Sequence, residues 1–181
     1  MVRFLFFLFC LAFASSVYSQ QALKTIRQAS KPGVNHAKLD FLEGDWKIRI
    51  QYQLRPGSNP ESASGTATFR WILGKRFMEQ KVDGKGIAGN FEGHGTIGYD
   101  NVLGHFVGVW VDTMNSGLTR SKGVAEEGGS VLRFSGKTSD ALEQREVSFS
   151  SALEKISADE LLYTVTSEGG EKVLEIQYRR K

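Results

Sequence analysis

Between Trp46 and Tyr178 the sequence alternates, run after run, between apolar and polar side chains, with turn-forming residues between the runs. In the clearest run, from Trp46 to Leu54, every even-numbered residue is apolar and every odd-numbered residue is polar. Successive side chains of a strand point to opposite faces, so this alternation is typical of a sheet with one buried and one solvated face. No convincing helical period interrupts these runs, and the pattern therefore predicts an all-β fold.

About ten such runs follow one another, separated by segments rich in Gly, Asp, Asn and Pro. Connections this short favour consecutive antiparallel hairpins. A meander of ten strands leaves two unpaired edges, which closure into a barrel removes. We therefore predict an antiparallel up-and-down (meander) β-barrel, with an open sandwich as the alternative, and a closed barrel of this size has room for one small ligand. The expected strands are 46–54, 64–73, 75–83, 90–99, 105–113, 117–125, 130–137, 143–152, 160–167 and 172–180.

The segment before the first strand is expected to contain a short helix. Leu39 and Leu42 share a face of a helix that would begin near His36 and end at Gly44. Residues 20–35 are polar and show no useful period, so we expect a flexible lead-in there, with a short helix from Ala22 to Ala29 as the alternative. The barrel domain is then expected over residues 36–181.

Residues 1–19 are typical of a secretory signal peptide that is removed before Gln20. Arg3 supplies a positive charge, Phe4 to Ala14 is almost unbroken apolar sequence, and small residues follow at cleavage positions. The apolar stretch is too short to span a bilayer, which takes about 20 residues; an uncleaved anchor is the alternative. The only cysteine, Cys10, lies in this leader, so the mature chain would have no thiol for disulfides, thiolate catalysis or zinc binding. We expect a protein secreted to a periplasm or exterior, with no membrane contact after cleavage.

The net charge of +3 carries little information about partners, because the basic residues are scattered over alternating strand positions. Only Arg179-Arg180-Lys181 forms a basic run. Nucleic-acid binding requires a concentrated basic face, so no nucleic-acid partner is expected. The charges instead favour a solvated exterior on a monomer or a homodimer.

Two segments resemble known families. Leu42-Glu43-Gly44-Asp45-Trp46 resembles the motif that opens the first strand of lipocalins and the wider calycin group, in which the Trp plugs one end of the barrel and an Arg near the last strand packs over it. The resemblance implies a barrel-closing role for Gly44, Trp46 and Arg180. The second segment, Phe91 to Asn101 with its Gly-x-Gly-x-x-Gly-Tyr-Asp-Asn core, is similar to a secreted bacterial family of uncharacterised lipocalin-like domains.

This second resemblance also includes Leu73-Gly74-Lys75-Arg76-Phe77, Gly104 and Trp110-Val111-Asp112, and it covers roughly residues 39 to 180. What it implies is the fold, because the family has no settled activity. Small-ligand carriage by lipocalins is an analogy at the level of the fold.

Candidate ligand-binding residues come from the middle strands. Phe91, Gly93, Gly95, Ile97 and Tyr99 share one face of their strand, and repeated glycines that face inward indicate that something bulky needs the space. A neighbouring Trp71 or Trp110 ring, or barrel curvature, is one interpretation, and a ligand cavity is the other. Aromatic and methionine side chains suit an apolar pocket with few polar groups. The predicted lining is Trp71, Met78, Phe91, Tyr99, Phe106, Trp110, Asp112 and Met114.

No cofactor and no metal site are expected. The three histidines, His36, His94 and His105, are not spaced as metal ligands, and small haem-binding barrels usually supply a histidine from a late strand, whereas none follows His105. A carboxylate-based catalytic site around Glu79, Asp112 and Tyr99 is a third hypothesis, which requires these side chains to meet in one cleft. The alternative for Asp112 is a hydrogen bond to the following Asn115-Ser116-Gly117 turn.

The run 105–113 is apolar on both of its faces, so its outer face needs a cover. Residues 22–42, packed as a short helix, or a homodimer contact would supply one. The leading functional hypothesis is a secreted barrel that binds a small, mainly apolar molecule. The second is a structural or matrix-associated extracellular protein whose barrel is packed solid and whose strand 105–113 meets a partner.

Overall fold

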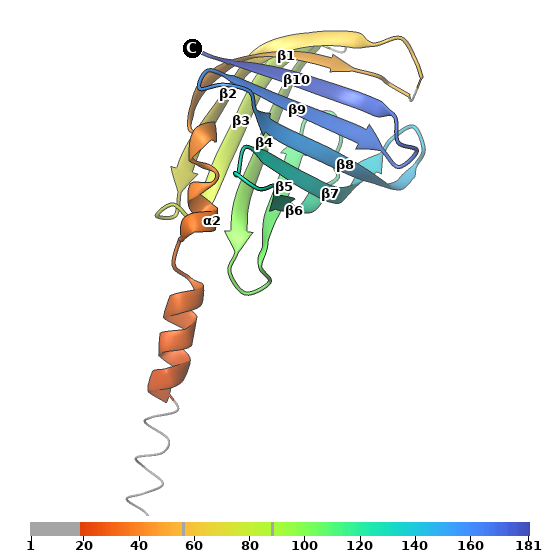
Figure 1. The fold of residues 1–181 in the computed structure, drawn as a ribbon. Helices are drawn as coiled ribbons and strands as arrows, with labels where there is room; N and C mark the ends of the chain where they lie inside the picture. The colour runs from red at the N-terminus through yellow and green to blue at the C-terminus, as the bar shows by residue number, and fades with distance from the viewer. Residues whose placement is uncertain (1–18, 56, 88) are drawn as a thin grey trace, which may run out of the picture. The chain divides into compact units, whose positions relative to one another are not determined.

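The strands close into a single barrel in which each pairs with its neighbour along the chain and the last pairs with the first (Figure 1). The computed structural model describes residues 19–181 except residues 56 and 88. All pairings are antiparallel, so the prediction of an all-β, ten-stranded up-and-down barrel is confirmed. Within the described residues the strands are β1 (Gly44–Tyr52), β2 (Glu61–Ile72), β3 (Phe77–Gly86), β4 (Gly89–Asp100), β5 (His105–Asp112), β6 (Thr119–Ala125), β7 (Val131–Asp140), β8 (Arg145–Lys155), β9 (Glu160–Ser167) and β10 (Lys172–Arg180).

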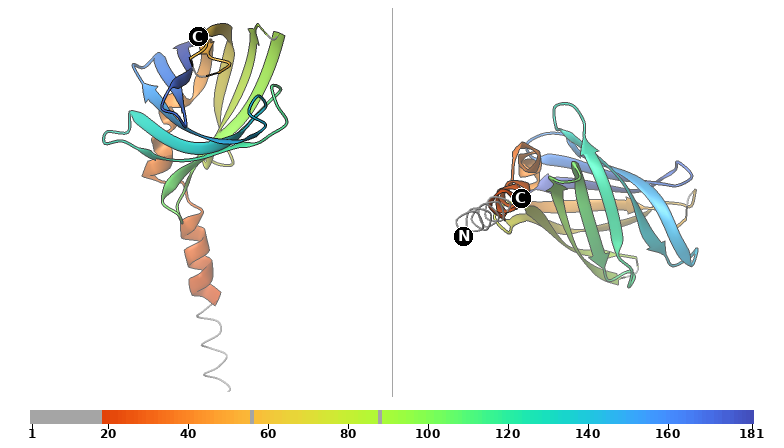
Figure 2. Two further views of the ribbon diagram at one scale, coloured as in Figure 1. Left: turned by 90° about the vertical axis from the view of Figure 1, so that its right-hand side faces the viewer. Right: turned by 90° about the horizontal axis from the view of Figure 1, so that it is seen from below.

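The apolar alternation corresponds to the inner face of the barrel. In β1 the even-numbered residues Trp46, Ile48 and Ile50 are buried, whereas the odd-numbered residues between them are exposed. The register carries this parity around the sheet, because Ile48 pairs with Tyr178 of β10 and Ile50 with Ile176. Figure 2 shows the strands coiling around the enclosed interior. The strand boundaries differ from the predicted ones by a few residues, because the apolar alternation becomes irregular where a strand runs into a turn.

Two short helical turns precede β1, α2 (Val34–Ala37) and the 3₁₀ turn η1 (Asp40–Leu42). They begin and end close to the helical segment predicted between His36 and Leu42. Residues up to Lys31 belong to a separate unit, in which residues 19–29 are helical and cover the predicted alternative helix from Ala22 to Ala29. The predicted signal peptide lies, apart from Ser19, outside the described residues. No helix in the described part of the chain is long and apolar enough to cross a membrane.

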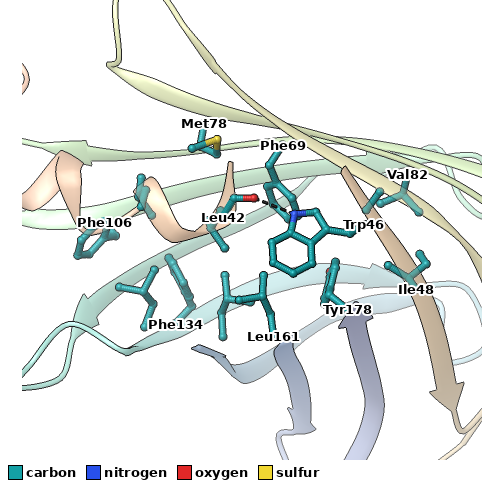
Figure 3. Packing of buried hydrophobic residues seen from close by; sticks show 14 of the residues in the cluster. Leu42, Trp46, Ile48, Phe69, Met78, Val82, Phe106, Phe134, Leu161 and Tyr178 are labelled. Atoms are coloured by element: carbon teal, nitrogen blue, oxygen red, sulfur yellow. Dashed lines mark hydrogen bonds between the residues drawn. The ribbon is translucent and has the colours of Figure 1, made fainter. Parts of the chain in front are cut away.

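One end of the barrel is plugged by side chains (Figure 3). Trp46 has no exposed surface, and its Nε1 donates a hydrogen bond to the Leu42 carbonyl oxygen, 2.9 Å away. Apolar side chains from the helical turns and from several strands surround it in one hydrophobic cluster, with the Tyr178 ring packed edge-on at a centroid distance of 6.3 Å. Fully buried members of the cluster are Leu39, Leu42, Phe69, Met78, Phe106 and Leu132.

Arg180 covers this plug from outside. Its guanidinium lies 4.2 Å from the centroid of the Trp46 ring, where the negative face of the indole attracts a cation. It also donates hydrogen bonds to the carbonyl oxygens of Glu43 at 2.8 Å, Ala158 at 3.2 Å and Phe41 at 3.4 Å. Gly44 has a φ of +141° and leaves room for this guanidinium, because a Cβ at that position would overlap Arg180 Nη1. Gly44, Trp46 and Arg180 therefore lie together at the closed end of the barrel.

The prediction that residues 22–42 cover the outer face of β5 is wrong for residues 34–42. Residues 34–42 belong to the closed end of the barrel, where His36 packs against Tyr99, and not to the outer face of β5. On that outer face Val109 and Val111 remain 43% and 44% exposed. The apolar character of both faces of β5 therefore leaves an exposed valine stripe.

Candidate functional site

A cavity of about 690 Å³ occupies the barrel interior on the side away from the plug. All ten strands contribute to its wall, and the hairpins at the open end form its rim. Its volume lies within the range of about 300–1,000 Å³ that is usual for small-molecule sites. Apolar side chains on its wall include Ile50, Phe69, Val82, Phe91, Ile97, Trp110, Phe134, Leu153, Val165 and Ile176.

Small inward-facing residues leave this space open. Gly108, Ser121 and Thr119 line the cavity at positions whose side chains point into the barrel, as the pairing of β5 with β6 requires. Larger side chains at these positions would take up part of this space. The cavity follows from these choices of residue.

Two glycines of β4 make room for the indole ring of Trp110 on the neighbouring strand. A Cβ on Gly93 would overlap the Trp110 ring, and a Cβ on Gly95 would lie 2.8 Å from Trp110 Cε3. The same device recurs where Phe91 packs over Gly84 of β3 and where Phe134 packs over Gly123 of β6. The interpretation that a neighbouring Trp110 ring fills the gap over the glycines is therefore confirmed, and the cavity lies beside that ring.

The deep end of the cavity carries a group of neutral polar side chains. Gln80 Nε2 donates a hydrogen bond to Tyr178 Oη at 3.3 Å, and Ser151 is hydrogen-bonded to Tyr163. Burial raises the pKa of both phenols, and in Tyr178 the neighbouring Tyr163 raises it further. The two tyrosines are therefore uncharged hydrogen-bonding groups at all physiological pH values.

The rim of the cavity carries the charges. Asp112, the last residue of β5, accepts hydrogen bonds from Trp110 Nε1 at 2.7 Å and from the Met114 amide at 2.8 Å. Arg145 Nη2 donates to Glu168 Oε1 at 2.5 Å, and this bond is the main reason why the pKa of Glu168 lies below its usual value. Asp140 holds the turn after β7 by accepting from the Leu142 and Glu143 amides. The aspartates thus organise turns at the rim; Asp112 accepts from the Met114 amide, one residue before the Asn115-Ser116-Gly117 turn of the predicted alternative.

The predicted ligand-binding residues separate into two groups. Phe91, Trp110, Asp112 and Met114 line the cavity. The other four do not line it and belong to the plugged end, where Trp71 Nε1 donates to Asp40 Oδ1 at 2.9 Å and Tyr99 packs against Phe106 at a centroid distance of 5.0 Å. Met78 is fully buried in the plug. The structure therefore brings together only half of the predicted set.

Sequence reasoning missed the polar residues at the deep end, namely Gln80, Ser151, Tyr163 and Tyr178. A signal for two of them was present. Tyr163 shares the parity of Leu161 and Val165 in β9, and Tyr178 that of Ile176 in β10, so both phenols stand at inward positions.

The hypothesis of a carboxylate-based catalytic site is wrong. Asp112 faces the cavity, whereas Glu79 lies on the outer face of β3, where its Oε1 is 3.0 Å from His94 Nε2. Tyr99 lies at the plugged end, against His36. The three side chains do not share a cleft, so no acid–base pair can form among them.

Histidines do not take part in the cavity wall of the described structure. His36 is buried beside the plug, and its Nδ1 accepts a hydrogen bond from the Gly33 amide at 3.1 Å. His94 faces outward, and His105 begins β5 at the plugged end. Among the described residues, no group of three or more His, Cys, Asp or Glu side chains is arranged to hold a metal ion.

The fold is similar to solved barrels. The Rv2717c protein of M. tuberculosis matches with a TM-score of 0.62 and 17% identity, over 83% of this chain and 99% of that chain. A de novo designed fluorescence-activating β-barrel matches with a TM-score of 0.45 and 15% identity, over 78% of this chain and 95% of that one. A redesigned barrel, mFAP1 bound to DFHBI, also has a TM-score of 0.45, with 12% identity over 79% of this chain and 98% of that one. At these identities the likeness concerns the fold alone.

No curated protein matches the sequence. A family model described as "Protein of unknown function (DUF1579)" matches residues 31–180, which is almost the whole barrel unit. The expected resemblance to an uncharacterised family is thus shown at the level of family and barrel fold. The chain belongs to the DUF1579 family of proteins of unknown function.

Proposed function

We propose that this protein binds a small, mainly apolar molecule inside its barrel. The observation that carries the proposal is the cavity of about 690 Å³, which opens at one end and is walled by side chains from every strand. Burial of an apolar ligand against this wall would contribute roughly 25 cal/mol for each Å² removed from water. Neutral polar groups at the deep end, such as Gln80 and Tyr178, would orient the ligand.

The competing idea of a barrel packed solid does not fit the interior. At the plugged end the inward positions hold Trp46, Phe106 and Leu132, which have at most 1% of their surface exposed. At the open end the inward positions of β5 and β6 hold Gly108 and Ser121. The hypothesis of a structural or matrix-associated protein required a solid barrel core, and the interior at the open end does not meet this requirement.

Titration of the purified protein with Nile red, a neutral solvatochromic dye, tests the proposal. We expect saturable binding to one site, with a blue-shifted emission from the apolar interior. Val165→Trp places an indole in the cavity from β9 and should abolish binding, whereas Thr164→Trp, on the outer face of the same strand, should leave it unchanged. Unsaturable binding, or equal binding by both variants, would contradict a site inside the barrel.

We also propose that the protein carries out this function outside the cytoplasm. The support is the leader pattern of residues 1–19, with Arg3 followed by the apolar stretch from Phe4 to Ala14. Mass spectrometry of the exported protein should find Gln20 as the first residue. A cytoplasmic protein that retains its first residues would contradict this.

A second candidate role is contact with another chain through the outer face of β5. Val109 and Val111 are 43% and 44% exposed and lie side by side on that face, with Arg120 and His94 as their cross-strand neighbours. Light scattering of the wild type and of Val109→Lys distinguishes the two states: a dimer that the variant separates would support a homodimer contact, and a monomer at all concentrations would exclude one.

A further inference from the structure

The polar atoms at the deep end of the cavity indicate what kind of molecule the barrel takes. This inference rests on the proposed function, since it concerns the ligand of the same cavity. Tyr178 is the central group: it lines the cavity, its exposed fraction is only 3%, and its ring is fixed by Trp46 and by Phe69. Its hydroxyl is therefore held in one place and cannot swing out to water.

The hydrogen bonds of Tyr178 leave one donor unused. A phenol oxygen can accept hydrogen bonds and donate one. Within the described residues, Tyr178 Oη accepts from Gln80 Nε2 at 3.3 Å, and no protein group accepts the Tyr178 proton in return. A buried donor without an acceptor costs free energy, and a ligand oxygen at this position would satisfy it.

Charged groups are absent from the surroundings of this donor in the described structure. The side chains that line the cavity near Tyr178 are Phe69, Gln80, Ile176, Tyr163 and Ser151. An ionised ligand group placed here would lose its hydration without gaining an opposite charge, which is strongly unfavourable. The ligand group that best fits the deep end of the cavity is therefore an uncharged hydrogen-bond acceptor.

The rim strengthens the discrimination against anions. The charged side chains that line the cavity are five carboxylates and two arginines, all in the turns at the open end or at the strand positions beside them. One arginine, Arg145, is already paired with Glu168. An anionic amphiphile would meet a net negative potential at the mouth, although the whole chain carries a charge of +3.

We infer that the barrel selects an uncharged apolar molecule with a carbonyl-type oxygen, which accepts a hydrogen bond from Tyr178 at the deep end of the cavity. The apolar remainder of the molecule lies along Phe91, Trp110 and Phe134 toward the rim. The hydrogen bond supplies orientation and selectivity, and the apolar wall supplies most of the affinity.

Three naphthalenes that differ in one group test this inference: 2-acetylnaphthalene, 2-ethylnaphthalene and 2-naphthoate. Their dissociation constants are measured by displacement of Nile red from the wild type and from Tyr178→Phe, which removes the donor and keeps the ring. We expect the affinity of the acetyl compound, relative to the ethyl compound, to fall about fivefold or more in the variant, the effect of one hydrogen bond. The naphthoate should bind the wild type more weakly than the acetyl compound.

Tyr99→Phe is the matched control, because this tyrosine lies at the plugged end, outside the cavity. It should leave the acetyl-to-ethyl ratio of affinities unchanged. Retained affinity for 2-ethylnaphthalene shows that Tyr178→Phe is folded. A ratio that is the same in the wild type and in Tyr178→Phe, or a preference for the naphthoate, would overturn the inference alone. Failure of all three compounds and of Nile red to bind would overturn the proposed function as well.

Discussion

The two ends of the barrel are built from the same strands but differ in the size of their inward side chains. At the plugged end Trp46, Met78, Phe106 and Leu132 are fully buried and pack against Leu42 of the helical turn. At the open end the same faces of the sheet carry glycine, serine and threonine beside isolated aromatic rings. One end can therefore supply the stability of the fold, and the other is free to accommodate a ligand.

This division explains why stability and binding should respond to different substitutions. The plug combines close packing with hydrogen bonds from buried donors, such as Trp46 Nε1. Side chains of the cavity wall have no packing partners on the side that faces the cavity, so removal of atoms there costs less. Four measurements test whether the two ends differ in this way.

The largest effect is expected for Trp46→Ala. The substitution empties the centre of the plug and removes the surface on which Arg180 lies, and it should lower the free energy of unfolding by about 3–5 kcal/mol. Met114→Ala at the rim, where the side chain is 58% exposed, should change it by less than about 0.5 kcal/mol. Denaturant unfolding measures both, and equal losses would refute the division of the barrel into two ends.

Gly44→Ala should have the next largest effect. Alanine strains a backbone with a φ of +141°, and its Cβ would displace the Arg180 guanidinium, so we expect a loss of about 1–3 kcal/mol. Gly33→Ala is the matched control, because nothing lies within 4 Å of a Cβ there and its φ is ordinary. Thermal unfolding of the two variants checks the difference. Similar midpoints would show that the closed end tolerates displacement of Arg180.

A smaller effect is expected from pH, through His36 at the plugged end. Burial lowers the pKa of this imidazole in the folded state below its ordinary value of about 6.5, and the positive charge of Arg76 is a second, smaller cause. The unfolded chain therefore takes up the proton first, so stability should be complete above about pH 6.5 and fall as the pH drops toward the folded-state pKa. Denaturant unfolding between pH 7.5 and 5 should show this slope, and His36→Gln should reduce it. An unchanged slope in the variant would assign the pH dependence to other groups.

The smallest effect is expected for Arg145→Gln at the rim. Arg145 pairs with Glu168, but both side chains are about half exposed, and ion pairs on the surface contribute little because water and salt screen them. The thermal midpoint should not change measurably. A clear decrease would mean that the rim, too, holds the barrel together.

The sequence predicts the wall of this barrel better than it predicts the position of a residue along the barrel axis. The sequence pattern identifies all ten strands, and in β1 it also identifies the inward face, because alternation reports directly on which side chains are buried. It does not report depth. Met78, Phe91, Phe106 and Trp110 share inward parity, yet two lie in the plug and two beside the cavity, since depth depends on the register between strands.

The polar residues of the cavity were missed for a related reason. Gln80 in β3 and Ser151 in β8 are inward-facing polar residues within strands of mixed composition, and the alternation alone gives no reason to select them. Their role becomes visible only when the register places Ser151 beside Tyr163 of the neighbouring strand and Gln80 within reach of Tyr178, across β2 and β1. Long-range pairing, rather than local pattern, builds this part of the site.

The pairing of β10 with β1 has a consequence for how the nascent chain acquires its shape. Until β10 has folded, β1 and β9 each lack one neighbour, and the indole of Trp46 has no guanidinium above it. Closure of the barrel joins residues from opposite ends of the domain, a topology associated with slow folding. A chain truncated before Lys172 would keep two unpaired strand edges, on β1 and β9, and should aggregate instead of closing into a barrel.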